Sequence, residues 1–166
     1  MEKKFSGRMR NILVSLLLAL GIVAIIITSV LGSKQDETYK QGAGAFKDIQ
    51  EKFAQRDYAS AQKELEQLIA SYPNSYLVQW QYGISLAGQQ KYQEAAEWYE
   101  KARKQRPFLV RNQQYVLQYG EVLYHVQDYK RATRYLKEVE KLNQHPQFTE
   151  QAHVLLADIA EKEAKQ

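Results

Sequence analysis

The sequence predicts an all-α protein, with an N-terminal transmembrane helix, a right-handed solenoid of about three helical repeats and a C-terminal capping helix. Three observations support this prediction: an uncharged apolar run near the N-terminus, a pattern that returns after 34 residues, and an amphipathic stretch at the C-terminus. The 166 residues have room for one membrane segment and one small domain. The expected parts are a basic tail (1–11), a transmembrane helix (12–32), a linker (33–41), repeat units (about 42–75, 76–109 and 113–147) and a capping helix (148–166).

The apolar run covers residues 12–31 and contains no charged side chain over its 20 residues. A helix of this length spans about 30 Å, which matches the hydrocarbon thickness of a bilayer. The alternative is a cleavable signal peptide with a cleavage site near Gly32. The apolar core of such a peptide is usually about 7–15 residues long, so the length favours a retained anchor in the lipid bilayer.

Positive charge is concentrated before this run. Residues 1–11 contain four basic side chains and one acidic side chain, whereas residues 12–166 contain 19 basic and 18 acidic side chains. Basic residues beside a membrane segment tend to stay in the cytoplasm, so we expect a cytoplasmic N-terminus and a repeat domain outside the cytoplasm. A repeat domain this close to neutral lacks the broad positive surface that nucleic acids require, so we expect no nucleic-acid partner.

The rest of the chain contains three copies of one pattern. Residues 56–73 and 90–107 align at an offset of 34 residues, and a third copy in residues 127–142 follows at an offset of 37. The connection around residues 108–112 is therefore three residues longer than its counterpart. A period of this length indicates an array of helix pairs. The aligned positions are Tyr58, Tyr92 and Tyr129; Ala61, Ala95 and Ala132; Leu65, Tyr99 and Leu136; Leu68, Ala102 and Val139; and Pro73 and Pro107.

Two glycines lie inside the first helices of their units. Gly83 and Gly120 each cost about 1 kcal/mol relative to alanine in a helix. We therefore expect another helix to pass too close for a side chain at these points, with Ala95 and Ala132 as the small partners. Replacement of Gly83 by alanine is then mild only if there is room for a methyl group.

These tyrosines, alanines and prolines resemble the tetratricopeptide repeat family over residues 42–142. The sequence departs from the family pattern at Ile49, where glycine is usual, and at Trp80, which displaces the large aromatic expected earlier in the helix. In this family the first helix of each unit lines a concave groove. The resemblance implies a groove that contains Phe46, Gln50 and Phe53; Trp80, Ile84 and Ala87; and Leu117, Glu121 and Tyr124.

The resemblance implies a scaffold that binds a protein or peptide partner. The best-known peptide-binding subset clamps a C-terminal carboxylate with lysine, arginine and asparagine, and the implied groove lacks these residues. An apolar, aromatic groove suits an extended or helical apolar segment, with Trp80 as the main anchor. The layout resembles bacterial membrane proteins that act in envelope assembly or secretion. Alternatively, the last helix or a second copy of the chain fills the groove. The alternative function is that of a structural membrane protein that uses the repeats to form homo-oligomers.

The sequence contains no signature of catalysis. It has no cysteine, which excludes disulfides and thiol chemistry, and no glycine-rich phosphate loop. Glu150 and His153 share a helix face but supply only two ligands, so we expect no metal, no cofactor and no enzyme activity. The last stretch, residues 148–165, is amphipathic, and we expect its apolar side to contain Val154, Leu155, Ala157 and Ile159.

Overall fold

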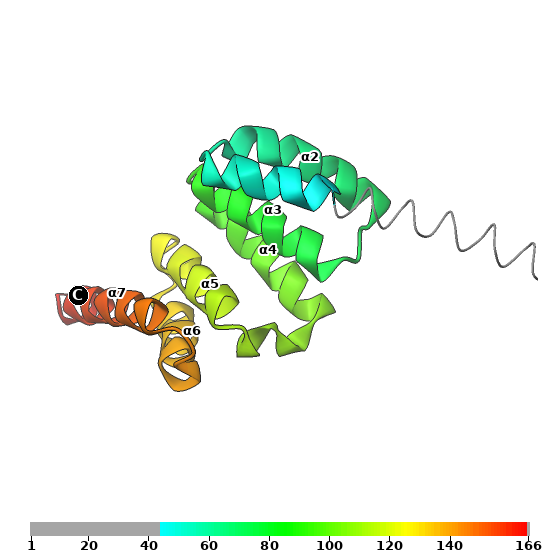
Figure 1. The fold of residues 1–166 in the computed structure, drawn as a ribbon. Coiled ribbons are helices and arrows are strands. Elements are labelled where there is room, and N and C mark those ends of the chain that lie inside the picture. The colour runs from blue at the N-terminus through cyan, green and yellow to red at the C-terminus, as the bar shows by residue number, and fades with distance from the viewer. Residues whose placement is uncertain (1–43, 166) are drawn as a thin grey trace, which may run out of the picture. The chain divides into compact units, whose positions relative to one another are not determined.

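A computed structural model describes residues 44–165 of the chain, and within this part all regular structure is helical. The predicted all-α repeat fold is confirmed for these residues, with the elements side by side in chain order in Figure 1. The elements are a helix over residues 44–54, α2 (Tyr58–Ser71), α3 (Tyr76–Gly88), α4 (Tyr92–Gln105), the 3₁₀ helix η1 (Pro107–Arg111), α5 (Gln113–His125), α6 (Tyr129–Leu142) and α7 (Pro146–Ala164).

The chain divides into two compact units, residues 1–46 and residues 47–166. The predicted basic tail, transmembrane helix (12–32) and linker all lie outside the described residues. Among residues 44–165, no helix is both long enough and apolar enough to cross a membrane. The description below concerns the second unit.

The turns inside the three repeats share one backbone conformation. Arg56, Gln90 and Gln127 have φ angles of 59°, 61° and 63°, at the same spacings of 34 and 37 residues as the sequence pattern. This left-handed conformation is uncommon for residues other than glycine and reverses the chain tightly. The side chains of Asp57 and Asp128 then accept a hydrogen bond from the backbone N–H three residues later, which caps α2 and α6. Each pair of helices is thereby held close together.

The connection between the second and third units has its own structure. Pro107, at the end of the second repeat, begins the 3₁₀ helix η1, and Leu109 of this helix is buried. Asn112 then caps α5 by accepting a hydrogen bond from the backbone N–H of Tyr115 at 2.9 Å. The longer connection is therefore an ordered element that packs against α4, α5 and α6.

The core lies between successive helices, each of which contacts the next from α2 to α7, and α5 also contacts α7. The aligned repeat positions provide much of this core. The alanines of the pattern are fully buried, as are the large residues one turn later. These buried positions are Ala61, Ala95 and Ala132, and Leu65, Tyr99 and Leu136.

Helices do pass close to both glycines, but the nearest groups are not the expected alanines. A Cβ atom on Gly83 would lie 2.8 Å from Cδ2 of Tyr99, and the carbonyl oxygen of Ala95 is farther away at 3.6 Å. A Cβ atom on Gly120 would lie 2.9 Å from Cδ2 of Leu136. The large side chains reach the glycines because they project from the second helix one turn after the alanine. Neither glycine has room for a methyl group without movement of its neighbour.

The buried side of α7 differs from the expected one. Ala152 and Ile159 are buried and Leu155 is half-buried, whereas Val154 is 62% exposed and Ala157 is exposed. Positions 152, 155 and 159 lie on one helical face, and position 154 lies on the opposite one. The composition of this segment therefore identified the helix, but the choice of Val154 and Ala157 as buried residues was wrong.

Candidate functional site

The first-helix positions that were expected to line a groove divide into buried and accessible residues. Trp80 and Leu117 are only 8% and 4% exposed, so they belong to the core. Ile84 and Phe53 are half-buried, and Glu121 is exposed. The expectation that Trp80 faces open space was wrong, because α5 covers this side chain.

The contacts of Trp80 explain its burial. Its ring packs edge-on against Tyr115 of α5, with 5.4 Å between the ring centroids. Its Nε1–H donates a hydrogen bond to Oε1 of Gln118, also in α5, at 2.9 Å. Trp80 therefore joins the second unit to the third. The alternative that the last helix buries Trp80 is also not observed.

Three of the remaining predicted positions, Phe46, Gln50 and Phe53, belong to the helix over residues 44–54. Nε2 of the exposed Gln50 donates a hydrogen bond to Oε1 of Gln81 at 3.3 Å. Phe53 packs against Tyr58, with 5.9 Å between the ring centroids. Phe46 is half-buried and belongs to the first compact unit, so its place relative to the other positions is not described.

A pocket of about 220 Å³ lies between α3 and α5 and includes three of the residues implied for the groove, Ile84, Ala87 and Glu121. We call it the groove pocket. The sequence pattern assigned Tyr58 and Tyr92 to repeat packing, and they line the pocket as well. It gave no indication of Gln118. The lining residues are Tyr58, Ile84, Ala87, Gly88, Tyr92, Tyr99, Gln118, Glu121 and Val122.

The orientation of Gln118 gives the groove pocket a hydrogen-bond donor. Its Oε1 accepts hydrogen bonds from Trp80 Nε1 and, at 3.3 Å, from the hydroxyl of Tyr99. Because an indole N–H can only donate, Gln118 must present its oxygen to Trp80 and turn its NH₂ group away. Within residues 44–165 no hydrogen bond engages this NH₂ group, so it is available to a ligand. Burial raises the pKa of Tyr99, which keeps its hydroxyl neutral.

The last helix covers one end of the predicted groove. The hydroxyl of Tyr124 donates a hydrogen bond to Oδ2 of Asp158 in α7, and Nζ of Lys162 donates to Tyr124. The ammonium group of Lys162 also lies over the tyrosine ring, with Nζ 4.4 Å from the ring centroid. Tyr124 is thereby occupied by the chain itself, whereas α7 contributes no residue to the groove pocket. Within residues 44–165, α7 therefore closes the groove at Tyr124 and leaves the groove pocket open.

A comparison with known proteins gives one family match and several similar folds. Residues 47–109 match the sequence model of a family described as tetratricopeptide repeat. No curated protein sequence matches the chain. The similar solved structures have low sequence identity, so their likeness concerns the fold.

Three of these structures illustrate the likeness. The TPR2B domain of yeast Sti1, in a pHsp70 complex, is 17% identical over 71% of this chain and 94% of its own, with a TM-score of 0.60. The Yersinia enterocolitica type III secretion chaperone SycD, in complex with a peptide of the translocator YopD, is 16% identical. The match covers 76% of this chain and 95% of SycD, with a TM-score of 0.61. The second TPR domain of human RPAP3, in complex with an HSP70 peptide, is 17% identical. The match covers 70% of this chain and 92% of that domain, with a TM-score of 0.58.

The match over residues 47–109 and the similar solved structures agree with the arrangement of repeated helix pairs. The described part of the chain therefore has the tetratricopeptide-repeat fold, and residues 47–109 match the sequence model of that family.

Proposed function

We propose that this chain is a scaffold that binds a protein or peptide segment in the groove pocket. The observation that carries the proposal is the combination of a free amide donor on Gln118 with an exposed carboxylate on Glu121, between aromatic and aliphatic walls. A peptide backbone offers carbonyl oxygens to the first group and N–H groups to the second. Its side chains would rest against Ile84 and Tyr92. The similar yeast, human and Yersinia domains have peptide or protein segments in their complexes, which supports this class of ligand.

The proposal also includes the location of the scaffold. The uncharged run of residues 12–31 is long enough to anchor the chain in a membrane, and the basic residues before it favour a cytoplasmic N-terminus. The repeat domain would then act outside the cytoplasm, in envelope protein assembly or secretion. Protease added outside spheroplasts should digest the repeat domain, and protection until the membrane is opened would contradict this location.

Site-specific crosslinking in intact membranes tests the partner site. Tyr92 lines the groove pocket and can be replaced by benzoylphenylalanine, which preserves an aromatic ring at this position. We expect crosslinks to another protein from this position and few from a control at Lys130, which is exposed and outside the pocket. Addition of Ile84→Ala should reduce the yield at position 92. Crosslinks only between copies of this chain would instead favour the self-associating structural protein.

A further inference from the structure

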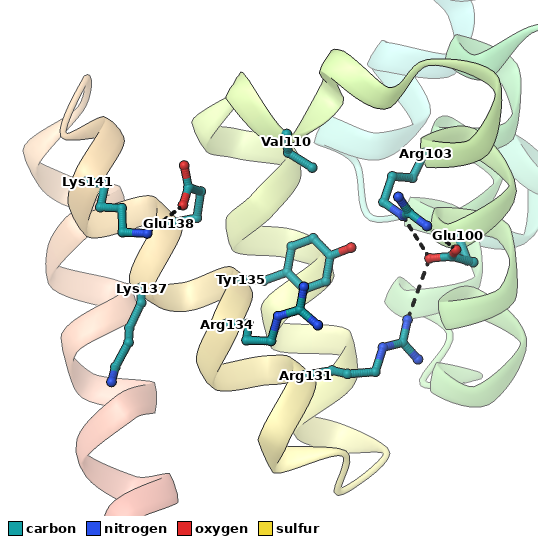
Figure 2. Close-up of a pocket in the computed structure, with 9 residues that line it drawn as sticks. All are labelled: Glu100, Arg103, Val110, Arg131, Arg134, Tyr135, Lys137, Glu138 and Lys141. Carbon is teal, nitrogen blue, oxygen red and sulfur yellow. Dashed lines mark hydrogen bonds and ion pairs between the residues drawn. The ribbon is translucent and has the colours of Figure 1, made fainter.

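A second pocket, of about 830 Å³, lies between α4 and α6 and next to η1. We call it the basic pocket. Figure 2 shows its side chains, with Glu100 and Arg103 of α4 opposite Arg131 and Tyr135 of α6. It shares no lining residue with the groove pocket. The lining residues are Glu100, Arg103, Val110, Arg131, Arg134, Tyr135, Lys137, Glu138 and Lys141.

The basic pocket gathers charge that is dispersed along the sequence. Five of its lining side chains are basic and two are acidic. The chain after residue 11 carries 19 basic and 18 acidic side chains, so the excess here is local. Both carboxylates are already engaged: Glu138 pairs with Lys141 at 3.1 Å, and Glu100 pairs with Arg103 at 2.6 Å. The pocket therefore has more positive charge than its own carboxylates neutralise.

Glu100 holds two of the basic groups in place. Its carboxylate accepts hydrogen bonds from Nε and Nη2 of Arg103 at 3.0 and 2.6 Å, and Nη2 of Arg131 lies 3.6 Å away. The hydroxyl of Tyr119 donates to the same carboxylate at 3.1 Å. The hydrogen bonds from Arg103 lower the pKa of Glu100, so this carboxylate stays ionised. The two guanidinium groups are thus positioned before any ligand binds.

Three further polar groups of the pocket have no partner within residues 44–165. Arg134 and Lys137 are exposed and form no ion pair in this part of the chain. The half-buried Tyr135 makes no hydrogen bond through its hydroxyl in the same residues, and burial raises its pKa, so it stays neutral. Two free cations and a free hydroxyl group at a concave surface are suited to an anionic ligand.

We propose that the basic pocket binds an acidic peptide segment of a partner protein. The basic side chains of α6 extend from Arg131 to Lys141, which is about 15 Å along a helix. This length matches about five residues of extended chain. A concave pocket accommodates such a segment better than a flat membrane surface. Its charge is confined to one place, whereas nucleic acids need a broad positive surface. The proposal is independent of the groove pocket.

Calorimetric titration of the full-length chain in nonionic detergent tests this proposal, with N-acetylated hexaglutamate amide as the ligand. We expect binding that weakens strongly as salt rises from about 50 mM to about 500 mM, since exposed charges are screened. The double variant Arg134→Glu/Lys137→Glu should weaken binding roughly tenfold or more. Hexaglutamine amide should not bind.

The matched control is Lys47→Glu/Lys63→Glu, which makes the same change of net charge at exposed positions outside the pocket. It should leave the affinity within about twofold of the unmodified chain. Equal losses in both double variants would show that hexaglutamate responds only to net charge and would overturn the proposal. Tighter binding of decauridylate or of phosphatidylserine mixed micelles, lost in the Arg134→Glu/Lys137→Glu variant, would also overturn it in favour of RNA or lipid. A change of oligomeric state in that variant alone would point to a second copy of the chain as the occupant.

Discussion

Helices α3 and α5 occupy equivalent places in consecutive repeats, and residues of one correspond to residues of the other 37 positions later. At the first groove position both helices have a buried residue, Trp80 and Leu117. One turn later, Ile84 is half-buried and Glu121 is exposed. The accessible part of the groove therefore begins one turn later than the family resemblance implied. The first position joins one repeat to the next, and the second position lines the groove pocket.

The two helices also differ in the tyrosine that precedes the glycine. Tyr82 of α3 is half-buried, and its hydroxyl donates to the exposed Glu66 at 3.1 Å. Tyr119 of α5 is fully buried, and its hydroxyl contacts Glu100 and Arg131. The same residue type therefore supports a surface contact in one repeat and an internal polar network in the next. The second network also forms one wall of the basic pocket.

The largest expected effect on stability comes from truncating Trp80 or Leu117, the buried residues at the first groove position. Trp80→Ala should reduce the free energy of unfolding by about 3–5 kcal/mol, because it creates a cavity beside Tyr115 and removes the N–H donor that orients Gln118. Leu117→Ala should cost about 2–4 kcal/mol for the same reason. Denaturant unfolding of the full chain in detergent measures both. A stable Trp80→Ala variant that lost only partner crosslinks would restore Trp80 as an exposed anchor.

The burial of Trp80 also marks the limit of what could be predicted from the sequence. The repeat period and the buried alanines follow from a local pattern found in all three units, and the close helix approach at Gly83 follows from a glycine found in two of them. The covering of Trp80 depends on how α5 lies on α3, and therefore on Tyr115 and Gln118, which no repeat rule places. The sequence does not predict the basic pocket, because its charges come from α4 and α6 and each is typical of an exposed helix position.

The next effect compares the two glycines. Gly83→Ala should destabilise the fold by about 1–3 kcal/mol, because a methyl group would meet the buried and hydrogen-bonded ring of Tyr99. Gly120→Ala should cost less, since the flexible side chain of Leu136 can adjust more easily than the hydrogen-bonded ring of Tyr99. The gain of about 1 kcal/mol from alanine in a helix is common to both variants. Thermal unfolding of the two variants, compared side by side, provides the measurement. A larger loss at Gly120 would show that Leu136 is the more rigid neighbour.

A smaller effect is expected from the polar network of α5. The folded-state pKa of Glu100 lies below its ordinary value of 4.5, so its carboxylate stabilises the fold above pH 4.5, and this contribution is lost as the pH falls through the folded-state pKa. Glu100→Gln should therefore cost about 1 kcal/mol at neutral pH and progressively less in acid. Glu66→Gln, at the exposed contact of Tyr82, is the matched control and should change the free energy of unfolding by less than about 0.5 kcal/mol at neutral pH. Parallel stability curves for Glu100→Gln and the unmodified chain would contradict this prediction.

The smallest effect on stability should accompany a clear effect on binding. Glu121 is exposed and, among residues 44–165, is the one formally charged side chain that lines the groove pocket. Glu121→Ala should change the free energy of unfolding by less than about 0.5 kcal/mol, as is usual for surface substitutions. If a peptide backbone or a basic side chain contacts this carboxylate, its loss should weaken partner binding by roughly threefold or more. The yield of crosslinks from benzoylphenylalanine at position 92 measures the change. An unchanged yield, with the fold intact, would show that the partner does not contact the α5 wall of the groove pocket.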